Sequence, residues 1–180
     1  MTTYTGRTYV SRLFQKDLDE VFGLRRALER LAIEYACQHA ASEDIARAEA
    51  IVEQMAAAIE RGITAKEGVE LDLAFHDAIF KAARHQRLLD YWNTLRPQVY
   101  VFLLSRNVAS PDLSAFVVKV HRDIRNALET RDWRRSVDLV DGYMEHAYRL
   151  LSHTCGVPTD AGKASASDRP GGQADGGTAP

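Results

Sequence analysis

The feature that most constrains this chain is the spacing of its apolar residues, which repeats with a helical period along nearly all of its foldable length. Between Asp17 and about Ala41, charged residues separate the members of an apolar stripe: Leu18, Val21, Phe22, Leu28, Leu31, Ala32 and Tyr35. Residues three and four positions apart lie on one face of an α-helix, so these side chains can be buried together. The two-residue alternation that is typical of strands is nearly absent. The pattern therefore predicts an all-α fold.

Capping residues predict where the next two helices begin and end. Ser42 is expected to be the N-cap of a second helix, and Gly62 to end it, because glycine tolerates a positive φ. Thr64 is expected to open a third helix, with Glu67 completing a capping box. The first half of the chain is thus interpreted as three consecutive helices.

Proline and aspartate mark the second half of the chain. Pro97 lies within a helical segment from about 86 to 106. It predicts a kink or a break, because proline lacks an N–H donor and clashes with the preceding turn. Ser110 and Pro111 are expected to start a fifth helix as N-cap and first helical residue. Asp132 is expected to cap a sixth helix.

The composition favours a single domain without a nucleic-acid surface of its own. Of the 180 residues, 46% are hydrophobic. The Gly-, Ala-, Ser- and Pro-rich stretch 156–180 is expected to be a disordered tail. The remaining residues, about 150, are enough to bury one core. A formal net charge of −2 provides no broad basic field, which argues against a stand-alone nucleic-acid binder.

Cysteine usage and the lack of long apolar runs predict a cytoplasmic location. The chain has two cysteines, Cys37 and Cys155, too few for a disulfide framework, so a reducing compartment is expected. The N-terminal segment MTTYTGRTYV lacks the apolar run of a signal peptide. No stretch reaches the roughly twenty apolar residues that cross a bilayer. We therefore expect no contact with a membrane.

Asp72 and His76, in the segment ELDLAFHDAIF, are the most informative polar pair. Positions i and i+4 lie one above the other on a helix, so the carboxylate and the imidazole can face one point. His121 and His146, on later helical segments, can supply further nitrogens inside a bundle. Mixed N/O ligands suit a divalent metal such as zinc, nickel, manganese or iron. The alternative interpretation is an exposed Asp–His pair that binds no metal.

Three segments of the chain carry a family resemblance. They are DLDEVFGLRRALERLAIEYA, LDLAFHDAIFKAARHQRLLDYW and VHRDIRNALETRDWRRSVDLVDGYMEHA, which include DLAFH and the pattern H-x-x-I-x-x-A-L-x-x-x-D. In this order they resemble the FCD effector domain of the FadR subgroup of GntR transcription regulators. The resemblance implies an antiparallel bundle of six or seven helices over residues 16–155, a homodimer, and a small organic acid bound centrally, often through a metal. The family's metal ligands fall on Asp72, His76 and His121.

The fourth ligand position departs from the family pattern. When Asp132 is aligned with the family's turn aspartate, the place of the last histidine is taken by Tyr143, and His146 lies three residues further on. Three residues rotate a helical side chain by about 60° and raise it by about 4.5 Å. Three arrangements are open: a shifted helix brings His146 to the metal, Tyr143 hydrogen-bonds a ligand or a water, or the site holds no metal. We favour a three-ligand site with an altered fourth position.

The resemblance also implies an arginine against the effector's carboxylate, and that role falls on Arg25. A guanidinium presents paired donors that match the two oxygens of a carboxylate. The alternative is that Arg25 pairs with Glu29 at i+4 on a solvated face. Arg96 is a second candidate anion contact, and Tyr143 a further effector-binding candidate.

Residues 1–15 resemble the end of a DNA-binding domain. The segment GRTYVSRL is similar to the closing strand of a winged-helix domain's wing and its exit into the linker, so residues 1–15 are expected to be a remnant of both. The printed sequence has no recognition helix. We therefore expect DNA contact only through a winged-helix domain that this chain lacks.

The sequence favours one function and leaves two alternatives open. The favoured one is the ligand-sensing and dimerisation domain of a GntR-type regulator, which binds a small carboxylate with a divalent metal and is not an enzyme. The second is a truncated interaction subunit that modulates a full-length paralogue. The third is a metal-dependent hydrolase, for which Asp77 and Glu70 are the nearest candidate general bases.

Overall fold

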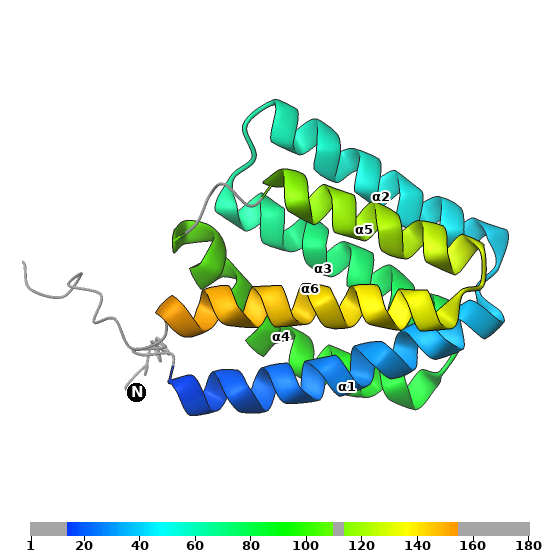
Figure 1. Ribbon diagram of the computed structural model, residues 1–180, viewed down its shortest axis with the longest axis horizontal. Helices are drawn as coiled ribbons and strands as arrows, with labels where there is room; N and C mark the ends of the chain where they lie inside the picture. The colour runs from blue at the N-terminus through cyan, green and yellow to red at the C-terminus, as the bar shows by residue number, and fades with distance from the viewer. Residues whose placement is uncertain (1–13, 110–113, 155–180) are drawn as a thin grey trace, which may run out of the picture.

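A computed structural model of the protein describes residues 14–109 and 114–154, and within these residues the chain forms helices only. They are α1 Gln15–His39, α2 Ser42–Glu60, α3 Ala65–Ala82, α4 Gln86–Ala109, α5 Ser114–Glu129 and α6 Trp133–Thr154. Helix α2 packs against α3, α3 against α4, and α5 against α6, and α1 packs against α6. In Figure 1 the start of α1 and the end of α6 lie at the same end of the bundle. The expected all-α bundle is confirmed. Residues 1–13 and 155–180, on which the expected linker and tail fall, lie outside the described residues.

Helix α3 is the central element of the bundle. It packs against α1, α2 and α4, and Figure 1 shows it between α5 and α6. A helix surrounded in this way must bury side chains on most of its faces. Its buried residues are Val69, Asp72, Leu73, Phe75, His76, Ala78, Ile79, Phe80 and Ala82. Any polar group on this helix that faces inward is therefore held away from bulk water.

The start of α2 lies one residue earlier than the sequence predicts. Ala41, not Ser42, is the N-cap. Its backbone N–H donates to the carboxylate of Asp44 at 2.9 Å. This is the return bond of a capping box, which the third helical residue makes to the N-cap, and no cap by the Ser42 hydroxyl is present. The end of the helix is as predicted, because Gly62 has a φ of 88°.

The predicted capping box at the start of α3 is half formed. Thr64 is the N-cap, and its hydroxyl accepts a hydrogen bond from the backbone N–H of Glu67 at 3.2 Å. The Glu67 carboxylate is paired with the guanidinium of Arg61. An ion pair with a nearby arginine has thus replaced the return bond to the Thr64 backbone.

Of the kink or break predicted at Pro97, the break is wrong, because α4 continues through it from Gln86 to Ala109, and the kink stays a prediction. Buried side chains hold the helix in place on both sides of the proline: Trp92, Leu95, Val99, Phe102 and Leu103. This packing offsets the loss of one backbone hydrogen bond. The predicted cap of α6 is confirmed, because Asp132 Oδ1 accepts from the backbone N–H of Arg135 at 3.1 Å. Ser110 and Pro111 lie outside the described residues.

Two connections place an arginine in the left-handed region, which non-glycine residues rarely adopt. Arg84, after α3, has a φ of 54°, and Arg131, between α5 and α6, has a φ of 59°. Each has side-chain partners: Arg84 bonds the carboxylate of Asp44 at 2.6 Å. Arg131 donates to the backbone carbonyls of Cys37 at 3.0 Å and Ala40 at 2.6 Å. The turn after α5 is thus bonded to the C-terminal end of α1.

The length and apolarity of the described helices decide whether they could cross a bilayer. Over 14–109 and 114–154, none combines the length and apolarity that a membrane-spanning helix needs.

Candidate metal centre

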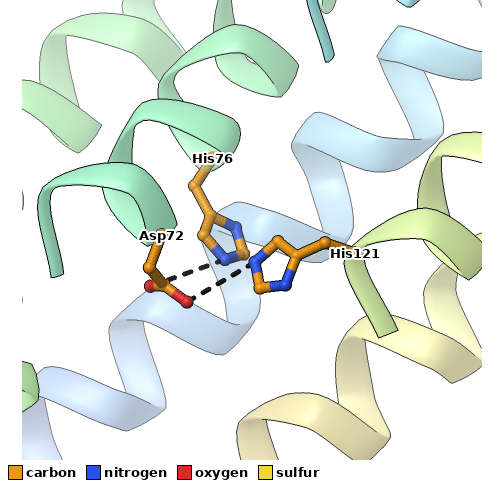
Figure 2. Close-up of side chains that lie close together, drawn as sticks. All are labelled: Asp72, His76 and His121. Carbon is orange, nitrogen blue, oxygen red and sulfur yellow. Dashed lines mark ion pairs between the residues drawn. The ribbon is translucent and has the colours of Figure 1, made fainter. Parts of the chain in front are cut away.

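Asp72 and His76 on α3 and His121 on α5 converge inside the bundle. One ligand atom of each lies within 4.8 Å of the others, and all three residues are buried. Figure 2 shows both imidazoles directed at the carboxylate of Asp72. The exposed Asp–His pair that was the alternative interpretation is thus not what the structure shows. The i,i+4 spacing places the first two residues on the inner face of α3, and α5 brings the third against them.

The ring of His121 is oriented by the backbone of its own helix. Its Nδ1 lies 2.7 Å from the carbonyl oxygen of Val117, one turn earlier. A carbonyl can only accept, so Nδ1 carries the proton and Nε2 of the neutral ring is a lone-pair acceptor. Nε2 lies 3.4 Å from Oδ1 of Asp72. The metal-facing nitrogen is therefore unprotonated in the neutral ring.

The ring of His76 is oriented by a side chain of α1. Its Nδ1 lies 2.8 Å from Oε2 of Glu29, and its Nε2 lies 4.0 Å from Oδ2 of Asp72. Metal-binding histidines commonly direct their second ring nitrogen to a carboxylate or a carbonyl in this way. His76 and His121 thus follow the same scheme with two different acceptors.

The three converging groups lack partners among the described residues. Nε2 of His76, Nε2 of His121 and Oδ2 of Asp72 are buried and have no hydrogen bond there. Buried polar atoms without partners cost free energy, and lone pairs that face one another repel. A divalent cation would satisfy all three. Two imidazoles and one carboxylate are a ligand set that suits zinc, nickel, manganese or iron, so the residues fit the metal that the sequence predicts.

Tyr143 on α6 completes the surroundings of Asp72. It is buried, and its hydroxyl donates a hydrogen bond to Oδ1 of Asp72. Burial and the nearby charge of Asp72 raise the pKa of Tyr143 above its usual value, which keeps the phenol neutral. Its ring centroid lies 5.0 Å from that of His121 and 5.9 Å from that of His76. Tyr143 therefore bonds the oxygen of Asp72 that lies 3.4 Å from Nε2 of His121, and Oδ2, 4.0 Å from Nε2 of His76, has no hydrogen bond among the described residues.

His146 is not among the converging ligand atoms. Its ring centroid lies 4.5 Å from that of Phe116. Among the arrangements that the sequence leaves open, this placement favours a hydrogen-bonding Tyr143 over a fourth histidine. No metal role for His146 follows from the described geometry.

Arg25 is buried beside the cluster. Its Nε donates to Oε1 of Glu29 at 2.6 Å, and one of its terminal nitrogens lies 3.7 Å from Oδ2 of Asp72. The pairing with Glu29 is present, but it lies in the interior and not on a solvated face. Both terminal nitrogens of Arg25 lack hydrogen bonds among the described residues. These two groups can donate to an anion.

The buried charges keep both carboxyl groups ionised. Burial by itself would raise the pKa of Asp72, but the protonated forms of His121 and His76 together with Arg25 outweigh this effect and hold the pKa well below its usual value. The pKa of Glu29 is also lowered, because Arg25 and His76 together exceed the effect of its burial. An ionised Asp72 is the form that a metal requires.

The other polar candidates lie in separate ion pairs. Arg96 donates to both oxygens of Asp77, at 2.9 and 3.0 Å, and Trp92 donates to the same carboxylate at 2.7 Å. Glu70 is exposed and pairs with Lys66 at 3.6 Å. The two residues named as nearest general bases are therefore engaged elsewhere, and an effector contact by Arg96 stays a prediction.

Glu29 and Arg106 are the polar residues whose place the sequence interpretation missed. Both are buried. The signal was present: Leu18, Phe22, Arg25 and Glu29 succeed one another at spacings of four, three and four residues. This is the spacing of one helical face. Arg106 likewise follows Phe102 and Leu103 on α4. A charged residue on an apolar stripe indicates a buried polar partner.

Comparison with known proteins agrees with this fold. The family model of the FCD domain matches residues 20–146. The chain belongs to the FCD domain family, the domain found in GntR-type transcription regulators, which are not an enzyme family. The Bacillus subtilis (strain 168) protein YdhC, described as an uncharacterized HTH-type transcriptional regulator, is 26% identical over 147 residues. The alignment covers 80% of this chain and 64% of the Bacillus protein, so the chain spans less than two thirds of that relative.

Two solved structures share the fold. Escherichia coli McbR/YncC has a TM-score of 0.69 at 20% identity, over 76% of this chain and 68% of that one. A GntR family regulator from Pseudomonas syringae pv. tomato str. DC3000 has a TM-score of 0.68 at 18% identity, over 79% and 58%. At these identities the similarity establishes the arrangement of helices.

Proposed function

We propose that this chain is the sensor domain of a GntR-type regulator, and that it binds a small carboxylate beside a divalent metal held by Asp72, His76 and His121. One observation carries the proposal: three buried residues on two helices bring ligand atoms together that have no hydrogen bond among the described residues. A bound divalent cation would supply Lewis-acid coordination for an oxygen of the carboxylate. The carboxylates of Asp72 and Glu29 balance its charge.

Arg25 supports the choice of a carboxylate as the effector. Its two terminal nitrogens lie in the interior and have no hydrogen bond among the described residues, although one of them lies 3.7 Å from Oδ2 of Asp72. A buried guanidinium with free donors favours an anionic ligand that can accept two parallel bonds. Arg25 would therefore bind the carboxylate of the effector, and a metal held by the three ligands would supply a second contact.

The proposed output is a change in the arrangement of a homodimer. A ligand shifts such an equilibrium only by the difference between its affinities for the two arrangements. The site is suited to this role, because its residues come from α1, α3, α5 and α6. A ligand that contacts several helices can favour one packing over another. DNA binding would belong to a winged-helix domain that is not among the described residues.

Metal analysis of the purified protein tests the metal half of the proposal. We expect about one divalent ion per chain after loading with zinc, nickel or manganese and removal of the excess. His121→Ala should lose it, because Nε2 of His121 is one of the three ligand atoms. His39→Ala is the matched control, since His39 is exposed on the last turn of α1. Equal metal content in wild type and His121→Ala would contradict the proposed ligand set.

Calorimetry with small mono- and dicarboxylates tests the effector half. We expect binding heat from the metal-loaded protein. In Arg25→Lys, affinity should fall by at least tenfold, because lysine keeps the charge but lacks the paired donors. Arg30→Lys is the control on the same helix, since Arg30 is half-exposed and pairs with Asp141. Absence of heat in both metal-loaded and metal-free protein across such acids would contradict the sensor function.

A further inference from the structure

We propose that Glu29 is the positioning residue that makes His76 a metal ligand, because it holds the proton of the imidazole on Nδ1 and leaves the lone pair of Nε2 toward Asp72. This inference rests on the proposed metal site. It assigns to Glu29 a role that its pairing with Arg25 alone would not require.

The first step is the position of Glu29 between two donors. Its Oε1 accepts from Nε of Arg25 at 2.6 Å, and its Oε2 lies 2.8 Å from Nδ1 of His76. An ionised carboxylate has no proton to donate, so the proton of this second bond belongs to Nδ1. The neutral imidazole has a single N–H. Nε2 must then be the acceptor, which is the form that coordinates a metal.

The second step is that no other group can take this role. The space lined by Glu29, Phe75 and His76 has no room for a water molecule. Among the described residues, Glu29 is the one polar partner of His76 Nδ1. His121 provides a comparison within the same site, because its Nδ1 is bonded to the backbone carbonyl of Val117. A change at residue 29 should therefore affect one histidine and not the other.

The third step is that an amide cannot replace the carboxylate. Both oxygens of Glu29 accept, whereas glutamine has one acceptor oxygen and one donor NH₂ group. Arg25 always remains a donor, so the oxygen of a glutamine will face it. The NH₂ group then faces His76 and requires Nδ1 to accept. The ring proton moves to Nε2, where it blocks the metal. Glu29→Gln therefore inverts the tautomer with almost no change in volume.

Nitrogen-15 NMR of the histidine rings tests the inference without any metal. In metal-free wild type, long-range ¹H–¹⁵N correlations should show His76 and His121 both protonated at Nδ1. In Glu29→Gln, His76 should change to the Nε2-protonated form, and His121 should not. A wild-type His76 protonated at Nε2 would overturn the inference, and this spectrum needs no variant that has to fold. A Glu29→Gln protein that keeps its proton on Nδ1 would overturn it as well.

Metal affinity provides the second readout. Titration with Zn²⁺ or Co²⁺ should show a loss of about 10- to 100-fold in Glu29→Gln, the usual effect of removing a partner of a metal-binding histidine. Asp44→Asn is the matched control. Asp44 is also a buried carboxylate that bonds an arginine, Arg84, but it lies on α2 outside the cluster. Asp44→Asn should lower the free energy of unfolding and leave the metal affinity unchanged.

The outcomes separate the two proposals. Wild-type metal affinity in Glu29→Gln overturns the positioning role and leaves the metal site standing. An equal loss in Asp44→Asn also overturns that role, because the loss would then reflect general stability. If wild type binds no metal while His76 changes tautomer as expected, Glu29 orients the imidazole, but the proposed metal site and the metal-binding role of His76 are both overturned.

Discussion

At the residue scale, the centre is a set of polar groups whose orientations are determined by partners outside it. Val117 and Glu29 orient the two imidazoles, and Tyr143 holds one oxygen of Asp72. Val117 and Glu29 bond the ring nitrogens that face away from Asp72, and Tyr143 bonds the oxygen of Asp72 that lies near His121. The atoms that face inward are the ones left without partners, as expected of a site organised before its ligand arrives.

The hydroxyl of Tyr143 should contribute to the stability of the metal-free protein. Tyr143→Phe leaves Oδ1 of Asp72 buried without a donor, which should lower the free energy of unfolding by about 1–3 kcal/mol. Urea unfolding at neutral pH measures this. Tyr148→Phe is the control, because its hydroxyl bonds Asp19 at 2.7 Å on the exposed side of α1. For Tyr148→Phe we expect the free energy of unfolding to change by no more than about 0.5 kcal/mol. Equal decreases in the two variants would contradict a stabilising role for the bond between Tyr143 and Asp72.

At the element scale, the packing of α1 depends on a bond from a distant turn. The last carbonyls of a helix have no partner within it, and Arg131 supplies donors to those of Cys37 and Ala40. Arg131 does so from a backbone with positive φ. The α5–α6 connection and the C-terminal end of α1 are therefore stabilised together.

Removal of the Arg131 side chain should destabilise the bundle moderately. We expect Arg131→Ala to lower the free energy of unfolding by about 1 kcal/mol, less than a buried charged bond would contribute because the guanidinium is exposed. This corresponds to a fall in Tm of about 2–4 °C. Arg131→Gly should lower the free energy of unfolding less than Arg131→Ala does, since glycine adopts a positive φ without strain.

Thermal unfolding with Arg135→Ala as the control measures the effect, because Arg135 is exposed on the first turn of α6. If Arg131→Ala and Arg131→Gly have the same Tm as wild type, the bonds from residue 131 to α1 do not contribute to stability.

At the scale of the whole molecule, the centre links elements that are distant in the sequence. Its ligands come from α3 and α5, and their partners from α1 and α6. The unfolded chain cannot bring these groups together, so a metal should bind the folded state far more tightly than the unfolded one.

Metal should accordingly raise the stability of the entire domain. At a free concentration of 100 times Kd, we expect an increase of about 2.7 kcal/mol in the free energy of unfolding. Thermal denaturation with and without Zn²⁺ measures it. His121→Ala should show no such increase. Stabilisation that is equal in wild type and variant would indicate binding elsewhere on the chain.

Most of the fold could be predicted from the sequence, because it follows from local rules. Helical periodicity, Gly62, Thr64 and Asp132 correctly predicted the helices and several of their ends. The break at Pro97 was wrong, because buried neighbours on both sides keep α4 continuous. The Ser42 cap was wrong, because Ala41 is the N-cap and Asp44 makes the return bond to its backbone N–H. Local preference failed where packing or a nearby side chain outweighed it.

The sequence by itself determined which helices form and that Asp72 and His76 share one face, since both depend on spacing along a single helix. Only the tertiary structure decided that His121 joins them, that Tyr143 and not His146 faces Asp72, and that Glu29 orients His76. These contacts join residues from different helices. Their geometry depends on how whole elements pack, which no local pattern records.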